Sequence, residues 1–307
     1  MIKTDFHVHV TDEETGIEES IRYFKDYCER NQLQGIGIHA AEFTSLIEHP
    51  TCNEKALAVS KADPNWFAFA GLRHARDFVE QTKEYMVQGF KGIKLLEGKP
   101  SIWRHYGYTY DAPRFEPFFA FAEEHAIPLL IHNNDPIHHW DINKISKTAL
   151  EKGWYYDETF PSQEYFFQSL EGVLDRHPNL HAAIAHFGFY DDNIPRAEAL
   201  MEKCPNLYMD MTPAPIIYDN LSATPEAAKA FILKYSKRLL FGTDVSNKIE
   251  GRVKDLNETK WRILTAFYEG CGLQTIGKHS IYGMELPEDI LQDIYHNNAM
   301  RFIGKTK

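Results

Sequence analysis

Short apolar runs, rich in β-branched and aromatic residues, alternate along the chain with segments whose apolar residues recur three and four positions apart. The runs predict strands, and the helical spacing of the segments between them predicts helices that pack on those strands. Eight strands are expected, at residues 2–8, 35–39, 66–72, 90–95, 127–132, 181–186, 206–211 and 239–244. A last helix is expected from about Pro287, a favourable first-turn residue, to Phe302.

Eight strands that alternate with helices predict an α/β fold, a single (β/α)8 or TIM barrel over residues 1–307. No Pro/Ser-rich linker, charge block or internal repeat divides the chain. A doubly wound open sheet would alternate in the same way, but no GxGxxG motif follows the first strand. The long segments 97–114 and 133–162 follow strands four and five, so we expect them at the catalytic face of the barrel.

Two histidines, His7 and His9, end the first predicted strand. Side chains two residues apart on a strand point the same way, so both imidazoles should face the barrel mouth and could bind one divalent ion. A single histidine there would more often be a core residue with its hydrogen bonds satisfied. The pair at this spacing, after Asp5, favours a metal site.

Three further residues end other strands at the same face: His132 on strand five, His186 on strand six and Asp244 on strand eight. Catalytic groups of such barrels come from the ends of several strands. Nitrogen and carboxylate ligands without thiolates suit zinc, manganese or iron. The four cysteines are scattered without a CxxC pair, which indicates reduced residues of a cytoplasmic protein.

The motifs DFHVH, GFKGIKL, PLLIH, AIAHFG, LLFGTD and YHNNAMRF follow one another from residue 5 to residue 302. In this order they resemble the amidohydrolase superfamily, in its amidohydrolase-related branch. The resemblance implies a distorted (β/α)8 barrel with a catalytic divalent metal, usually zinc. That branch contains hydrolases, lactonases and non-oxidative decarboxylases.

The resemblance also implies roles for individual residues. His7, His9 and His132 match the family's metal ligands on strands one and five. His186 matches a histidine that either binds a second metal or contacts the substrate, and Asp244 matches the acid that binds metal and transfers the proton.

Lys94 ends the fourth predicted strand, where some relatives use a carbamylated lysine to bridge two metals. We rank contact with a substrate carboxylate first, a bridging carbamate second and a solvated surface lysine third. One ion is therefore expected, or two if Lys94 is carbamylated. Arg73 could bind a carboxylate or pair with a neighbouring acid, and His39 ends strand two at the border of the site.

The charge and the apolar content of the chain indicate which classes of partner to expect. There are 33 Lys and Arg against 44 Asp and Glu, a formal net charge of −11, which argues against a nucleic-acid partner. No run of about 18 apolar residues is present, so no membrane span is expected. We expect a cytoplasmic enzyme that acts on a small molecule, and homo-oligomers are common among such enzymes.

The leading interpretation is a hydrolase that acts on a small polar or carboxylate-bearing amide, lactone or ester through a metal-activated water. Asp244 would take the proton, with His186 as the second candidate. The alternative is a non-oxidative decarboxylase on the same metal site. A phosphoesterase that begins DxHxH and a non-enzymatic metal-binding relative are further alternatives, the former disfavoured by the GTD motif.

Overall fold

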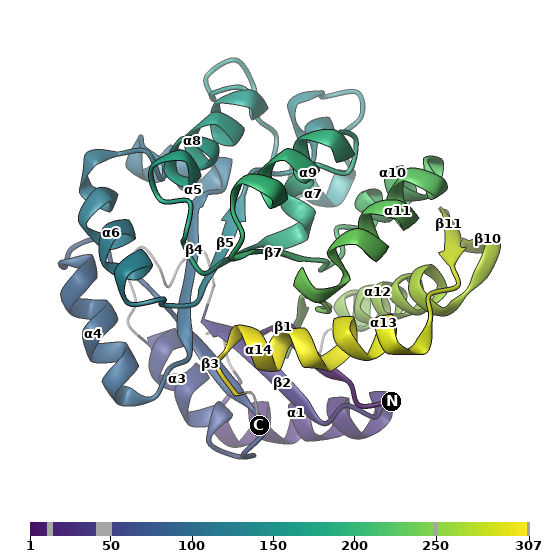
Figure 1. The fold of residues 1–307 in the computed structure, drawn as a ribbon, viewed down its shortest axis with the longest axis horizontal. Coiled ribbons are helices and arrows are strands. Elements are labelled where there is room, and N and C mark those ends of the chain that lie inside the picture. The colour runs from purple at the N-terminus through teal and green to yellow at the C-terminus, as the bar shows by residue number, and fades with distance from the viewer. Residues whose placement is uncertain (11–14, 41–50, 248–250, 306–307) are drawn as a thin grey trace.

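The computed structural model describes residues 1–10, 15–40, 51–247 and 251–305. Its centre is a parallel sheet of nine strands in the order β8-β7-β6-β5-β4-β3-β2-β1-β9, curled so that helices cover its outside (Figure 1). The strands are β1 (Thr4–Val10), β2 (Gly35–Ala40), β3 (Phe67–Gly71), β4 (Gly92–Gly98), β5 (Leu129–Asn133), β6 (Ala182–Ile184), β7 (Leu207–Asp210), β8 (Leu239–Leu240) and β9 (Val245–Ser246). Each lies within or next to a predicted run.

The two shortest strands are halves of the eighth barrel strand, of which β8 lies within the predicted run 239–244 and β9 directly follows that run. β8 pairs with β7, and β9 pairs with β1 on the other side of the barrel. Between these halves, the backbone N–H of Phe6 donates to the carbonyl of Phe241 at 2.8 Å. The eighth strand therefore links the first strand to the seventh, and the prediction of a distorted (β/α)8 barrel is confirmed.

Two strands end earlier than their apolar runs because their last residues leave the extended conformation. β6 stops at Ile184, and His186 and Phe187 have φ of 57° and 53°. β8 stops at Leu240, and Asp244, whose φ is 54°, directly precedes β9. Left-handed backbone at residues other than glycine is strained and collects at functional sites. Both breaks carry residues with expected catalytic roles.

Helices follow the strands as the periodicity predicts. In α8 the Ser162 hydroxyl accepts the Tyr165 N–H at the first turn, and Phe166, Leu170 and Val173 are buried on one face. The helices are α1 (Ile17–Asn31), α3 (Thr51–Ser60), α4 (Phe78–Gln88), α5 (Pro100–Tyr106), α6 (Glu116–Glu124), α7 (Lys147–Glu151), α8 (Gln163–Arg176), α9 (Ile194–Lys203), α10 (Pro215–Ala223), α11 (Pro225–Tyr235), α12 (Gly251–Glu269), α13 (Glu288–Gln292) and α14 (Asn298–Phe302). A π-helical turn joins α13 to α14, so the helix expected from Pro287 to Phe302 is confirmed.

One element was not predicted. A hairpin of β10 (Cys271–Ile276) and β11 (His279–Met284) follows α12 and lies at the edge of the molecule, beside α10 and α12 (Figure 1). Its turn uses Gly277 at φ 60°. Leu273 is largely exposed, so the hairpin lacks the regular apolar face that would have identified it.

Apolar side chains fill the barrel interior beneath the site. Phe302 of the last helix packs against Phe6 and Phe69, with ring centroids 5.5 Å and 6.5 Å apart. The barrel interior is therefore a packed apolar core, and the polar residues lie at the strand ends.

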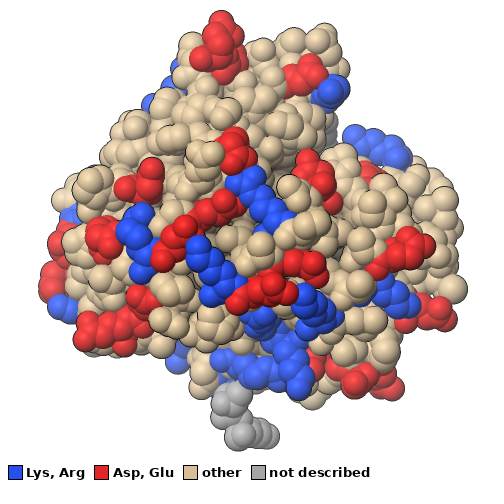
Figure 2. Space-filling view, turned by 45° about the horizontal axis from the view of Figure 1, so that its top comes forward, with Lys and Arg blue, Asp and Glu red and all other residues tan. Residues whose placement is uncertain are grey.

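On the outside, acidic and basic side chains are interspersed across the face that Figure 2 shows. No helix in the described part of the chain is both long and apolar enough to cross a membrane.

Candidate metal centre

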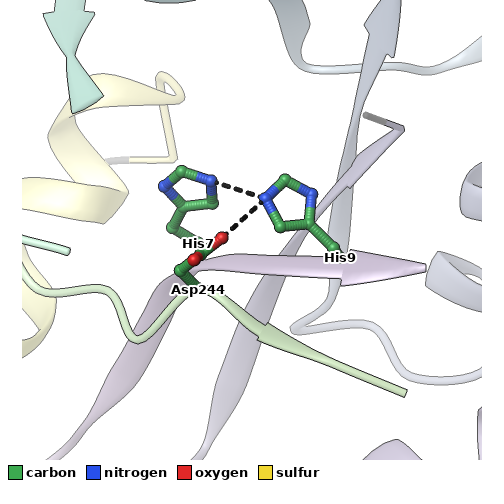
Figure 3. Close-up of side chains that lie close together, drawn as sticks. All are labelled: His7, His9 and Asp244. Carbon is green, nitrogen blue, oxygen red and sulfur yellow. Dashed lines mark hydrogen bonds and ion pairs between the residues drawn. The ribbon is translucent and has the colours of Figure 1, made fainter. Parts of the chain in front are cut away.

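Three side chains converge at the ends of β1 and of the broken eighth strand (Figure 3). The Nε2 atoms of His7 and His9 lie 3.0 Å apart, and His9 Nε2 lies 3.0 Å from Asp244 Oδ1. One potential ligand atom from each of the three residues lies within 4.8 Å of the others. The register of β1 against β2 shifts between Asp5 and Val8, and such bulges redirect side chains near active sites.

The remaining hydrogen bonds of the two imidazoles fix which nitrogen carries a proton. His7 Nδ1 donates to Asp210 Oδ2 at 2.6 Å, and His9 Nδ1 donates to the carbonyl of His39 at 3.2 Å. In the neutral imidazoles both Nε2 atoms therefore present lone pairs to the Asp244 carboxylate. A single proton can join only two of these three electron-rich atoms, whereas one divalent cation can bind all three.

The surroundings keep His7 and Asp244 in the protonation states that a metal requires. Burial, reinforced by the nearby Lys94 ammonium, holds the pKa of His7 well below its usual value, so the imidazole is neutral. Burial alone would raise the pKa of Asp244, but the Lys260 ammonium beside it holds that pKa well below the ordinary carboxyl range. The cluster thus offers a neutral imidazole at His7 and a carboxylate at Asp244.

Asp210 ends β7, and its Oδ2 accepts a hydrogen bond from His7 Nδ1. Its Oδ1 accepts from the backbone N–H and the hydroxyl of Thr212. Burial raises the pKa of Asp210, and the Thr212 hydroxyl and Lys94 oppose that rise. A carboxylate behind a metal-ligating histidine fixes its tautomer and increases its basicity.

Residues 4–305 match the model of the Amidohydrolase family. The chain belongs to the amidohydrolase family. The resemblance that the motifs indicated is therefore confirmed, and members of this superfamily are enzymes, among them hydrolases and decarboxylases. No curated protein matches the sequence.

Solved structures share the amidohydrolase fold at low identity. An uncharacterised TIM-barrel protein from Bordetella bronchiseptica is 15% identical with a TM-score of 0.61, and the match covers 99% of both chains. A dihydroxybenzoic acid decarboxylase from Polaromonas sp. JS666, with bound manganese and 2-nitroresorcinol, is 14% identical with a TM-score of 0.58 and coverage of 99% and 97%. Dihydroorotase from Campylobacter jejuni is 15% identical with a TM-score of 0.53 and coverage of 100% and 84%. The fold thus serves both hydrolysis and decarboxylation.

His132 and His186 lie beside the group of three without joining it. Their rings are 4.9 Å apart, and the ring of His186 is 5.7 Å from that of His7. His132 Nε2 donates to the carbonyl of Asn134, and His186 Nδ1 donates to that of Thr212. The Nε2 lone pair of His186 is therefore free to act, whereas His132 would have to turn from Asn134 to bind a metal through Nε2.

Lys94 and His39 lie deeper than expected. Lys94 is buried within β4, and its Nζ is 3.5 Å from His7 Nε2. His39 is fully buried, donates through Nε2 to the carbonyl of Phe6, and its ring centroid is 4.9 Å from that of His7. Lys94 therefore faces the cluster of His7, His9 and Asp244 directly, while His39 contacts the His7 ring and accepts a hydrogen bond from His9 through its carbonyl.

The residues of the loops after β3 and β5 differ in their contacts and exposure. Arg73 pairs with Glu54 at 3.1 Å, the second of the two roles that we weighed for it. Trp140 donates to the carbonyl of Pro161 and anchors its loop. His139 is buried, whereas the neighbouring His138 is half-exposed.

Two buried lysines near the cluster were missed in the sequence. Lys260 Nζ contacts Asp244, and Lys99 Nζ contacts both oxygens of Asp135 at 2.6 Å and 2.8 Å. Lys260 precedes Leu264 by four residues, on the apolar stripe of its helix. A charge in such a stripe requires a buried partner, and that signal could have identified it.

Proposed function

We propose that this member of the family is a metal-dependent hydrolase that acts on a small polar or carboxylate-bearing amide, lactone or ester. The observation that carries the proposal is the convergence of His7, His9 and Asp244 at the strand ends. We further propose that the enzyme is cytoplasmic and has neither a nucleic-acid nor a membrane partner.

The donor set fits one divalent ion, and zinc is our choice among the metals that bind nitrogen and carboxylate ligands. His7, His9 and Asp244 would hold it, with His132 and His186 as further ligands once His132 turns. When bound, the ion would supply a Lewis acid that polarises the substrate carbonyl and lowers the pKa of water.

The chain's own groups would move the proton. Asp244 is ionised and 29% of its side chain is exposed, so one carboxylate oxygen can take a proton from the attacking water and return it to the leaving group. His186, neutral because burial holds its pKa well below normal, is the second base at the mouth. Arg73 would bind the substrate directly once it has left Glu54. His39 would contribute indirectly, by holding His9 and His7 in place.

Lys94 is the group that indicates a negatively charged substrate. In the described part of the chain its buried ammonium forms no ion pair with a carboxylate; Asp210 and Asp244 act on it only at longer range. A buried charge without a close partner is costly, and an incoming carboxylate would supply that partner.

The same ammonium favours a second candidate function, non-oxidative decarboxylation. A substrate carboxylate held at Lys94 beside the metal cluster could itself be the group that leaves. Similar structures include a 2,6-dihydroxybenzoate decarboxylase complexed with 2,6-dihydroxybenzoate and the dihydroxybenzoic acid decarboxylase with bound manganese.

Product analysis separates the two reactions. The zinc-loaded enzyme would be incubated in ¹⁸O water with cyclic amides, lactones and hydroxybenzoates. Hydrolysis predicts an ¹⁸O atom in the product carboxylate and no carbon dioxide. Release of carbon dioxide without ¹⁸O in the aromatic product would replace the hydrolase proposal with the decarboxylase, and no turnover of any class would contradict both.

We predict that Lys94→Met raises the KM of an anionic substrate by about 10–100-fold, because it removes a charge-assisted hydrogen bond worth about 1.5–3 kcal/mol. The metal content should stay the same, and the melting temperature should not fall, since the lost charge had no close partner. Steady-state kinetics, metal analysis and calorimetry on the same samples provide the check. Loss of one of two bound ions would instead identify Lys94 as a bridging carbamate, and an unchanged KM would exclude substrate contact.

A further inference from the structure

Among the residues that the structure describes, the Lys260 ammonium forms two hydrogen bonds, and both are with Asp244. Its Nζ, buried on α12, donates to the backbone carbonyl of Asp244 at 2.7 Å and to carboxylate Oδ2 at 2.9 Å. The other carboxylate oxygen, Oδ1, is the one that faces His9. The two oxygens of Asp244 are thus divided, one toward the lysine and one toward the histidines.

Asp244 needs such support because of its backbone. Its φ of 54° places a non-glycine residue in the left-handed region, which persists only where neighbours enforce it. The Asp244 N–H donates to the carbonyl of His7 at 2.7 Å, and Thr243 is fixed by Asp5, which accepts from its N–H and its hydroxyl. On the C-terminal side of Asp244, Lys260 holds the backbone by donating to the Asp244 carbonyl.

We propose that Lys260 is a positioning residue that holds the Asp244 carboxylate so that only Oδ1 reaches the metal. The inference rests on the proposed metal site. Because one ammonium binds both the carbonyl and Oδ2, the Asp244 side chain cannot rotate without breaking this partly buried ion pair. Asp244 would then offer Oδ1 to the ion, while Oδ2 stays in its hydrogen bond with Lys260.

The competing explanation is that Lys260 only ties helix α12 to the barrel and so stabilises the fold. The chain offers a matched control for this explanation. Lys3 Nζ pairs with Glu269 Oε1 at 2.9 Å at the other end of α12. Lys3→Met therefore removes a lysine that bonds the same helix without touching Asp244.

The test uses Co²⁺ as the probe, bound to the full-length wild type, Lys260→Met, Lys260→Arg and Lys3→Met. Loss of a partner that orients a metal ligand typically costs about 10–100-fold in metal affinity, and we expect that loss in Lys260→Met. Its visible cobalt spectrum should also change, because a freed carboxylate can bind through both oxygens. Lys260→Arg, which keeps a cationic donor, should lie closer to the wild type, and Lys3→Met should match the wild type in affinity and spectrum.

A Lys260→Met variant whose cobalt affinity and spectrum equal those of the wild type would overturn this inference alone. The same holds if Lys3→Met changes both readouts equally. A wild type that binds no Co²⁺ would instead overturn the proposed metal site, on which the inference depends.

Discussion

Replacement of Asp244 by asparagine is expected to lower kcat by about 10²–10⁴-fold, the usual contribution of a general base. The amide is nearly isosteric with the carboxylate, but it cannot take a proton from water. His7 and His9 keep their lone pairs, so the variant should retain much of its metal. The measurement is kcat on the substrate found by product analysis, with metal content determined on the same preparation.

Asp191→Asn is a matched control for the loss of a buried carboxyl group elsewhere. Asp191 is buried, accepts a hydrogen bond from Asn220, and contacts none of the three cluster residues. It should turn over near the wild-type rate. If Asp244→Asn did so as well, Asp244 would be only a ligand or a structural acid, and the proton would have to pass to His186.

The second large effect concerns stability. Lys99 and Asp135 form a buried ion pair in which the carboxylate also accepts the Tyr156 hydroxyl, and the ammonium lies 4.6 Å from the centroid of Trp154. Removal of one partner of such a pair leaves an uncompensated charge and costs about 3–5 kcal/mol. We therefore expect Lys99→Met to lower the free energy of unfolding by about that amount at neutral pH, measured by urea denaturation.

The double variant Lys99→Met/Asp135→Asn is the control, because it removes both charges and should lose less than Lys99→Met alone. The ion pair also makes the free energy of unfolding depend on pH. Lys99 holds the pKa of Asp135 well below its usual value against the effect of burial, so the stabilisation is full above the ordinary carboxyl pKa of about 3.9. It is lost as the pH falls through the lower pKa of the folded state. An equal loss in the single and double variants, or a difference from wild type that grows in acid, would contradict the account.

The barrel could be predicted because each strand is a dense apolar run whose pattern does not depend on distant residues. The strand ends could be predicted less well. At His186 and Asp244 the backbone turns left-handed although the local sequence favours extension, and contacts such as that of Asp5 with Thr243 impose this turn.

The pair His7 and His9 was found from spacing alone, since two residues apart on a strand means one face. Lys260 and the Lys99–Asp135 pair could not be assigned in the same way. Their partners lie 16 and 36 residues away and come together only when the loops and α12 fold onto the barrel. Arg73 shows the converse, because only the folded chain decides between a substrate and the neighbouring Glu54.

The central claim is that His7, His9 and Asp244 form a metal site, and metal analysis tests it most directly. The wild type, purified and supplied with Zn²⁺ before gel filtration, is compared with His7→Ala/His9→Ala. A second variant, His105→Ala/His125→Ala, removes two exposed histidines as a control for adventitious binding. We predict about one ion per chain in the wild type and the control and almost none in His7→Ala/His9→Ala. Undiminished metal in His7→Ala/His9→Ala would contradict the account.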